Sequence, residues 1–106
     1  MKIVFIICAL VIVGACTKAP SNIRYTASGT GTGFTVDFVD GNGNHQTFTG
    51  ASPWENKFTA NSGAELSITG GTGTSGTSEV HIFINGADRA SDVEVGLNAT
   101  AHATVP

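Results

Sequence analysis

Apolar and polar residues alternate along most of the chain after residue 22. The alternation is clearest in four runs, at residues 23–27, 34–38, 64–68 and 80–84. Period-two alternation is the pattern of a β-strand that buries one face and exposes the other. These runs therefore predict strands, and shorter stretches at 46–49 and 57–60 predict two more.

The last part of the chain continues the same pattern. Odd positions from Val93 to Val105 are apolar, and several of them are alanine. We expect these odd side chains, Leu97 among them, to face inward, with the alanines packed closely against a neighbouring strand. About seven short strands, separated by turn signals roughly every 8 to 12 residues, predict an all-β fold, a single antiparallel β-sandwich.

Clusters of glycine, asparagine and serine separate the predicted strands. Residues 40–44 (DGNGN) and the pair Asn85-Gly86 are strong hairpin signals. Residues 28–33 (SGTGTG) predict a flexible connection or bulge, and residues 70–77 (GGTGTSGT) predict a mobile loop. Neither stretch is expected to bind phosphate or to hold a nucleophilic serine, because each precedes a strand and not a helix.

The N-terminal segment has a different composition. Residues 3–13 are all apolar, Lys2 precedes them, and Gly14, Ala15 and Cys16 follow. A positive start, an apolar centre and small residues at the end are the three parts of a secretory signal. The two small residues before Cys16 also resemble the lipobox of bacterial lipoproteins, in which the cysteine is lipidated and becomes the N-terminus after cleavage. The predicted parts of the chain are a signal peptide at 1–15, a lipidated linker at 16–22 and a β-sandwich domain at 23–106.

Two other interpretations of this segment are an ordinary cleaved signal and a retained membrane helix. A membrane-spanning helix needs about 20 apolar residues, and the run here is shorter, with Thr17 and Lys18 following soon after it. The lipobox resemblance implies a diacylglyceryl group with palmitate-type chains on Cys16, and two acyl chains hold a protein stably on a membrane. Cys8 is lost with the signal, so the exported domain has no thiol for a disulfide or a cysteine-based metal site.

Charge and composition exclude several classes of function. The chain has five basic and eight acidic residues and a net charge of −3. Because no basic stripe is present, we expect no nucleic-acid partner. Asp40, Asn42 and Asn44 have the spacing of the first EF-hand ligands, but His45 stands where that loop needs glycine and Ala51 where it needs glutamate. We therefore expect no calcium at this turn.

Trp54 and Tyr25 are the candidate residues for contact with a ligand or partner. Trp54 is the only tryptophan and follows a proline, so it either covers the core or lies exposed as a stacking surface. If Ile82 and Leu97 face inward, His81 and His102 both face outward, and their strands could be neighbours. Two histidines lack the third ligand that a metal site needs, and the acids are dispersed along the chain. We expect no metal, no cofactor and no catalytic site, and therefore no enzyme.

Four short motifs in a fixed order carry a resemblance to a known family: Tyr25-Thr26-Ala27-Ser28-Gly29, Asp40-Gly41-Asn42-Gly43, Pro53-Trp54 and Ile82-Phe83-Ile84-Asn85-Gly86. The chain resembles the MmpS-type small membrane proteins of mycobacteria over roughly residues 23–103. It looks closer still to short lipoproteins with the same pattern from Bacteroidota-like organisms. The resemblance implies an immunoglobulin-like β-sandwich that assists a large transporter of the resistance-nodulation-division class in exporting lipids or siderophores. The chain departs from the mycobacterial family in two features: Cys16 stands in place of the membrane helix, and a late cysteine pair is missing, with Val80 near the position of the first.

The leading prediction is a membrane-anchored envelope lipoprotein whose β-sandwich binds a protein partner, as an accessory to a machine such as a transporter. Two other functions stay open: a small-ligand or glycan-binding module that uses Trp54 or Tyr25, and a structural spacer of the envelope. Thr17 is not the aspartate that retains many lipoproteins in the inner membrane, and no acidic run follows Cys16. We therefore expect the domain on the periplasmic side of an outer membrane.

Overall fold

The structure is a computed structural model that describes residues 19–106. This part of the chain contains eight β-strands and no helix. The strands are β1 (Ser21–Gly29), β2 (Thr35–Val39), β3 (His45–Thr49), β4 (Trp54–Ala60), β5 (Glu65–Gly71), β6 (Thr77–Ile84), β7 (Ala87–Val95) and β8 (Ala99–Thr104). The all-β prediction is confirmed. There are eight strands and not about seven, because the late part of the chain forms two strands, β7 and β8, joined by residues 96–98.

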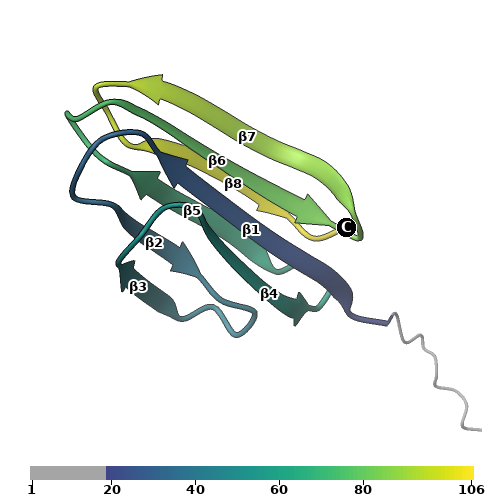
Figure 1. The fold of residues 1–106 in the computed structure, drawn as a ribbon. Coiled ribbons are helices and arrows are strands. Elements are labelled where there is room, and N and C mark those ends of the chain that lie inside the picture. Colours follow the sequence, from purple (N-terminus) through teal and green to yellow (C-terminus); the bar gives the residue numbers. More distant parts are fainter. Residues whose placement is uncertain (1–18) are drawn as a thin grey trace, which may run out of the picture.

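The eight strands form two antiparallel sheets of four strands each (Figure 1). The first sheet has the order β4-β1-β6-β7, and the second has the order β3-β2-β5-β8. The chain crosses between the sheets after β1, β3, β4, β5 and β7, so each sheet combines strands that are distant in sequence. This arrangement is compatible with the predicted β-sandwich.

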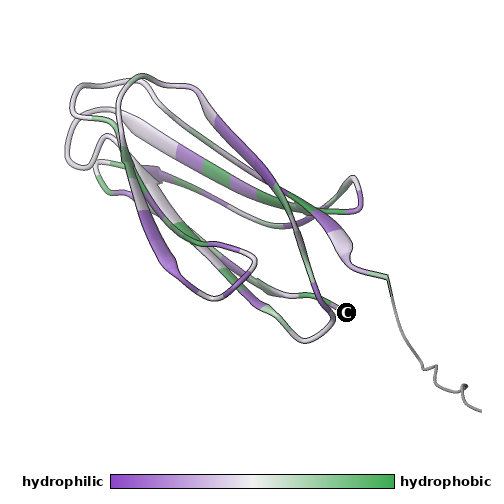
Figure 2. Cartoon of the chain, turned by 90° about the horizontal axis from the view of Figure 1, so that it is seen from below, coloured by the Kyte–Doolittle hydropathy of each residue, from purple (hydrophilic) through white to green (hydrophobic). Residues whose placement is uncertain are grey.

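The alternating residues build one core between the two sheets. Its buried side chains come from both inner faces: Ile23, Tyr25, Ala27, Val80, Ile82 and Ile84 from the first sheet, and Val36, Phe38, Leu66 and Ile68 from the second. Figure 2 shows hydrophobic and hydrophilic segments alternating along the strands. A fully buried aliphatic or aromatic side chain contributes roughly 1.5–3 kcal/mol relative to an exposed one, so these inner faces supply the main stabilisation of the fold.

The hairpin between β6 and β7 is the two-residue turn that its sequence predicts. Asn85 and Gly86 both have positive φ angles, 52° and 85°, as a type I′ turn requires. This turn also holds the start of β1, which begins at Ser21, two residues before the alternating run. The N–H of Asn22 donates to Oδ1 of Asn85, and the N–H of Asn85 donates to the carbonyl of Asn22, both at 2.8 Å.

The connections between strands lie at two opposite ends of the sandwich. We call the end where β1 begins the near end; its turns are 40–44, 61–64 and 85–86. The opposite, far end has the connections 30–34, 50–53, 72–76 and 96–98. The C-terminus also lies at the near end, where the N–H of Gly63 donates to the carbonyl of Val105 (2.8 Å). Within residues 19–106, no helix is long and apolar enough to cross a membrane.

Candidate functional site

Tyr25, one of the two predicted contact residues, lies inside the core and is 0% exposed. Its hydroxyl donates to the carbonyl of Val39 (2.6 Å) and accepts from the backbone N–H of Ser67 (3.2 Å). Burial raises the pKa of Tyr25 to about 12, although the hydrogen bond from Ser67 opposes this shift. A ring without exposed surface offers nothing for a ligand to stack on. The prediction of Tyr25 as a contact residue is therefore corrected: it is a core residue that ties the first sheet to the second.

Trp54, the other predicted contact residue, is partly buried at the start of β4. Its ring packs against Phe38 and Phe48 of the second sheet, with ring centroids 4.9 and 6.0 Å apart. Of the two positions that the sequence allowed, Trp54 therefore takes the one that covers the core. It also lines an open hollow of about 380 Å³ beside Glu55, and that carboxylate already pairs with Arg24 (3.2 Å).

The 40–44 turn closes the β2–β3 hairpin, as its sequence predicts. Oδ1 of Asp40 accepts the backbone N–H groups of Asn42 (2.9 Å) and Asn44 (3.0 Å), and Oδ2 accepts the side-chain amide of Gln46 (3.1 Å). These hydrogen bonds, the one from Asn44 foremost, lower the pKa of Asp40. Its carboxylate is therefore engaged by its own hairpin. No group of three histidine, cysteine or acidic side chains within residues 19–106 could hold a metal ion.

The two histidines predicted to face outward together lie on different sheets. His81 is on β6 of the first sheet, and His102 is on β8 of the second. The prediction of neighbouring strands is wrong because the chain crosses to the other sheet between β7 and β8. Side chains on the outer faces of opposite sheets cannot share a ligand.

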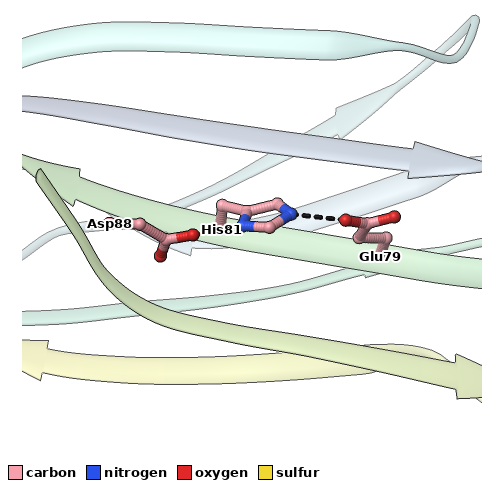
Figure 3. A network of polar contacts seen from close by, with 3 residues as sticks. All are labelled: Glu79, His81 and Asp88. Carbon is pink, nitrogen blue, oxygen red and sulfur yellow. Dashed lines mark hydrogen bonds and ion pairs between the residues drawn. The ribbon is translucent and has the colours of Figure 1, made fainter. Parts of the chain in front are cut away.

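His81 forms a polar network with two carboxylates (Figure 3). Its Nε2 lies 2.5 Å from Oε2 of Glu79, and its Nδ1 lies 2.8 Å from Oδ2 of Asp88. Burial disfavours the charged imidazole, but the hydrogen bonds with Glu79 and Asp88 outweigh burial and raise the pKa of His81. The ring also stacks on Phe83 (5.7 Å between centroids), over which the guanidinium of Arg24 lies at 3.9 Å. Both ring nitrogens are engaged, so the network is a clamp between β6 and β7.

Hydrogen bonds hold the glycine-rich connections of the far end together. The N–H of Thr30 donates to the carbonyl of Thr77 (3.1 Å), and the N–H of Thr77 donates to Oγ1 of Thr30 (2.9 Å). The N–H of Thr32 donates to Oγ of Ser75 (3.0 Å). Gly31 lies so close to Ser75 that a Cβ would overlap it, which only glycine permits. The segment predicted as a flexible connection or bulge at 28–33 and the one predicted as a mobile loop at 70–77 are therefore hydrogen-bonded to each other.

Three large hydrophobic side chains are exposed in the described part of the chain, and all three belong to one short segment. Val93 is 57% exposed, Val95 78% and Leu97 60%. Val93 and Val95 lie at the end of β7, and Leu97 lies in the β7–β8 connection at the far end. We call these three residues the apolar patch. The prediction that Leu97 faces inward is wrong, because the chain changes sheets at this connection and the inward alternation restarts at Ala99, which is 0% exposed.

The connection that carries Leu97 is fixed on both sides. The N–H of Gly96 donates to the carbonyl of Gly76 (3.0 Å), and Oδ1 of Asn98 accepts the N–H of Gly73 (2.8 Å). Gly96 has a φ of 75°, a conformation that favours glycine. Gly96 interrupts the alternation of apolar and polar residues between Val93 and Val105. It is the signal in the sequence that marks the end of β7, and it could have revealed the apolar patch.

Asp92 and Glu94 alternate with the two valines of the apolar patch on β7. Oδ2 of Asp92 accepts the backbone N–H of Thr100 on β8 (3.0 Å). The charge of Asp92, together with a hydrogen bond to it, raises the pKa of Glu94. Neither carboxylate forms an ion pair with another residue of 19–106. The apolar patch is therefore flanked by negative charge that no basic side chain of this part compensates.

Cys16, the predicted lipidation site, lies outside the described residues. Neither models of known protein families nor curated protein sequences match this chain. On the surface of the domain, the side chains of the apolar patch are exposed, whereas the predicted contact residues Tyr25 and Trp54 are buried and partly buried.

Proposed function

We propose that this chain is a membrane-anchored envelope lipoprotein whose β-sandwich binds a protein partner through the apolar patch. The observation that supports it is the joint exposure of Val93, Val95 and Leu97 at the far end. Apolar side chains gathered on the surface of a domain mark an interaction site more often than single exposed ones do. Hydrogen bonds on both sides of Leu97 keep this surface in place before a partner arrives, which limits the entropy lost on binding.

The lipid on Cys16 would hold the near end of the sandwich toward the membrane. Residues 17–20 separate Cys16 from β1, and an extended chain spans at most about 3.3–3.6 Å per residue. β1 then starts within roughly 20 Å of the lipidated residue. The apolar patch at the far end faces away from the membrane, on the periplasmic side of the outer membrane, where a partner reaches it.

We infer an immunoglobulin-like sandwich as the finer description of the fold. The pairing of β1 with β4, of β2 with β5 and of β5 with β8, and the crossings between the sheets, support this inference. Together with the resemblance to the MmpS-type proteins, they support an envelope machine such as a transporter as the partner. The domain would then be its accessory.

Replacing Cys16 with serine tests the anchor. We expect the wild-type chain in the membrane fraction of bacterial cells and Cys16→Ser in the soluble fraction, with unchanged β-structure by circular dichroism. Cys8→Ser is the matched control, because it removes the other thiol and should leave the chain on the membrane. A Cys16→Ser chain that stays in the membrane would contradict the lipid anchor.

Crosslinking in cells tests the partner. A photoreactive amino acid at Val95 should crosslink to a discrete protein, whereas the same amino acid at Thr49, exposed on the edge strand β3, should not. Identical products from both positions, or none from Val95, would argue against binding through the apolar patch.

A further inference from the structure

The apolar patch lies mainly on an edge strand. β7 spans nine residues and pairs with β6 on one side, and no strand of the described chain lies on its other side. Backbone N–H and C=O groups along such an edge can pair with another extended chain. Binding at this place can therefore involve the backbone as well as the side chains.

The two halves of β7 differ in how the edge is protected. Ile82 pairs with Ala90 and Phe83 with Asp88, which leaves Arg89 as a bulge in the half next to the near end. A bulge bends and twists an edge, and a charged side chain discourages pairing there. Residues 91–95 instead pair regularly with β6, and the apolar side chains of this half are exposed.

The other three edge strands present polar side chains outward. β4 exposes Glu55 and Lys57, β8 exposes Thr100 and His102, and every residue of β3 except Phe48 is exposed and polar. In residues 19–106, only the 91–95 half of β7 combines a regular edge with large exposed hydrophobic side chains.

The alternation on β7 specifies the side chains of a strand that would lie beside it. Val93 and Val95 point to one side of the sheet, and Asp92 and Glu94 point to the other. Side chains of adjacent strands meet on the same face of a sheet, and apolar pairs and pairs of opposite charge stabilise the pairing by about 0.2–1 kcal/mol each. The complementary strand alternates apolar residues with lysine or arginine.

The same carboxylates disfavour two other occupants. A second copy of this chain paired through β7 would bring two acidic strands together, and like charges on neighbouring strands are destabilising. An anionic membrane surface would meet the same repulsion. The electrostatics of Asp92 and Glu94 thus select a basic partner.

We propose that residues 91–95 of β7 bind a basic, extended segment of the partner protein. This segment would pair with β7 at the edge of the first sheet, as a ninth strand beside the eight of the domain. Its apolar side chains lie beside Val93 and Val95, and its lysine or arginine side chains lie beside Asp92 and Glu94. This inference rests on the proposed function, since it specifies the chemistry of the partner that the apolar patch binds.

A set of nine-residue peptides tests this inference on the full chain purified in detergent. In the first peptide, lysine alternates with valine; in the second, glutamate replaces lysine; the third repeats the first with N-methyl groups that remove its backbone N–H donors. We expect the first peptide to bind at least about ten-fold more tightly than either of the others. Backbone amide signals of residues 91–95 should shift in its presence.

Charge reversal on the protein supplies a matched control. Glu94→Lys should lower the affinity for the lysine peptide at least about ten-fold and raise the affinity for the glutamate peptide. Glu65→Lys makes the same change of net charge at the start of β5, away from the apolar patch, and should leave both affinities within about two-fold. Glu65 is exposed and Glu94 is partly exposed, and thermal unfolding verifies that each variant folds.

The results separate this inference from the proposed function. Equal binding of the lysine and N-methylated peptides would overturn the ninth strand, and equal effects of Glu94→Lys and Glu65→Lys would overturn the local charge match. Neither result would contradict the proposed function, because a crosslink from Val95 in cells would still show that a protein binds the apolar patch by another geometry. Binding of the chain's apolar patch to vesicles of anionic lipid, in place of the peptides, would overturn the choice of a protein segment.

Discussion

The two edge strands of the first sheet, β4 and β7, use the same alternation in opposite ways. β4 turns Trp54 toward the core and Glu55 toward solvent. β7 turns Asp92 toward β8, where it accepts a hydrogen bond, and leaves Val95 78% exposed. Alternation alone does not say which set of side chains is buried, because a shift by one residue exchanges the two faces. One edge therefore stabilises the fold, and the other presents a surface.

The largest difference between the two edges should appear on truncation to alanine. Trp54→Ala removes a ring that packs on Phe38 and Phe48, and we expect the free energy of unfolding to fall by about 3 kcal/mol, the low end for a tryptophan, because Trp54 is only partly buried. Val95→Ala, the matched change on β7, should cost no more than about 0.5 kcal/mol. Urea unfolding followed by circular dichroism measures both, and a comparable loss from Val95→Ala would contradict the distinction.

The next effect concerns β1, the strand beside β4. Tyr25→Phe removes the hydroxyl that hydrogen-bonds the backbone of Val39 and Ser67. Two partly buried backbone groups lose that partner, which should cost about 1–3 kcal/mol. The contribution of Tyr25 to the free energy of unfolding should also depend on pH. The unfolded chain loses the tyrosine proton near pH 10, whereas the folded chain keeps it until about 12, so stability falls across this interval.

Ultraviolet absorbance of the tyrosinate checks the pH effect directly, because Tyr25 is the only tyrosine of the chain. Its titration should be displaced upward from pH 10 in the folded protein and return to about 10 in urea. A titration at pH 10 under both conditions would show that Tyr25 is accessible, and would restore it as a candidate contact residue.

The core could be predicted from the sequence because its strands have unbroken alternation. Tyr25, Ile82 and Ile68 are buried where the pattern places them, and the Asn85-Gly86 turn needs only its two residues to be recognised. The pairing of β1 with both β4 and β6 could not be predicted in this way. Which strands meet depends on long-range packing, and alternation within one strand contains no information about its neighbours.

The candidate surface was missed for a related reason. The apolar odd positions continue from Val93 to Val105 with one parity, so the sequence predicts a single inward face. The chain changes sheets at Gly96, and the same parity faces solvent before this residue and the core after it. Gly31 and Ser75, which lie in segments predicted as a flexible connection or bulge and as a mobile loop, are in close contact, because a glycine without a Cβ permits close packing as well as flexibility.

The clamp between β6 and β7 should have a smaller effect that depends on pH. The hydrogen bonds of Glu79 and Asp88 raise the pKa of His81 above 6.5, so their stabilisation is complete below pH 6.5 and is lost as the pH rises through the raised value. His81→Gln should cost about 0.5–1 kcal/mol in acid, the range for a partly exposed ion pair, and little at alkaline pH. The control His102→Gln alters a histidine that forms no ion pair within residues 19–106, and it should change the free energy of unfolding by no more than about 0.5 kcal/mol.

The smallest effect on stability should come from substitution within the apolar patch itself. The same substitution at an exposed and at a buried valine shows how much of the effect is due to burial. Val95→Thr and Val80→Thr make the same change on neighbouring strands, but Val95 is 78% exposed and Val80 is 0% exposed. Burying the hydroxyl at Val80 should cost about 1–3 kcal/mol, whereas Val95→Thr should stay within about 0.5 kcal/mol. Val95→Thr should nevertheless lower the affinity for the peptide in which lysine alternates with valine, because threonine preserves the β-strand but removes part of the apolar contact. If affinity is unchanged while the fold is also unchanged, Val95 is an exposed valine that no partner uses.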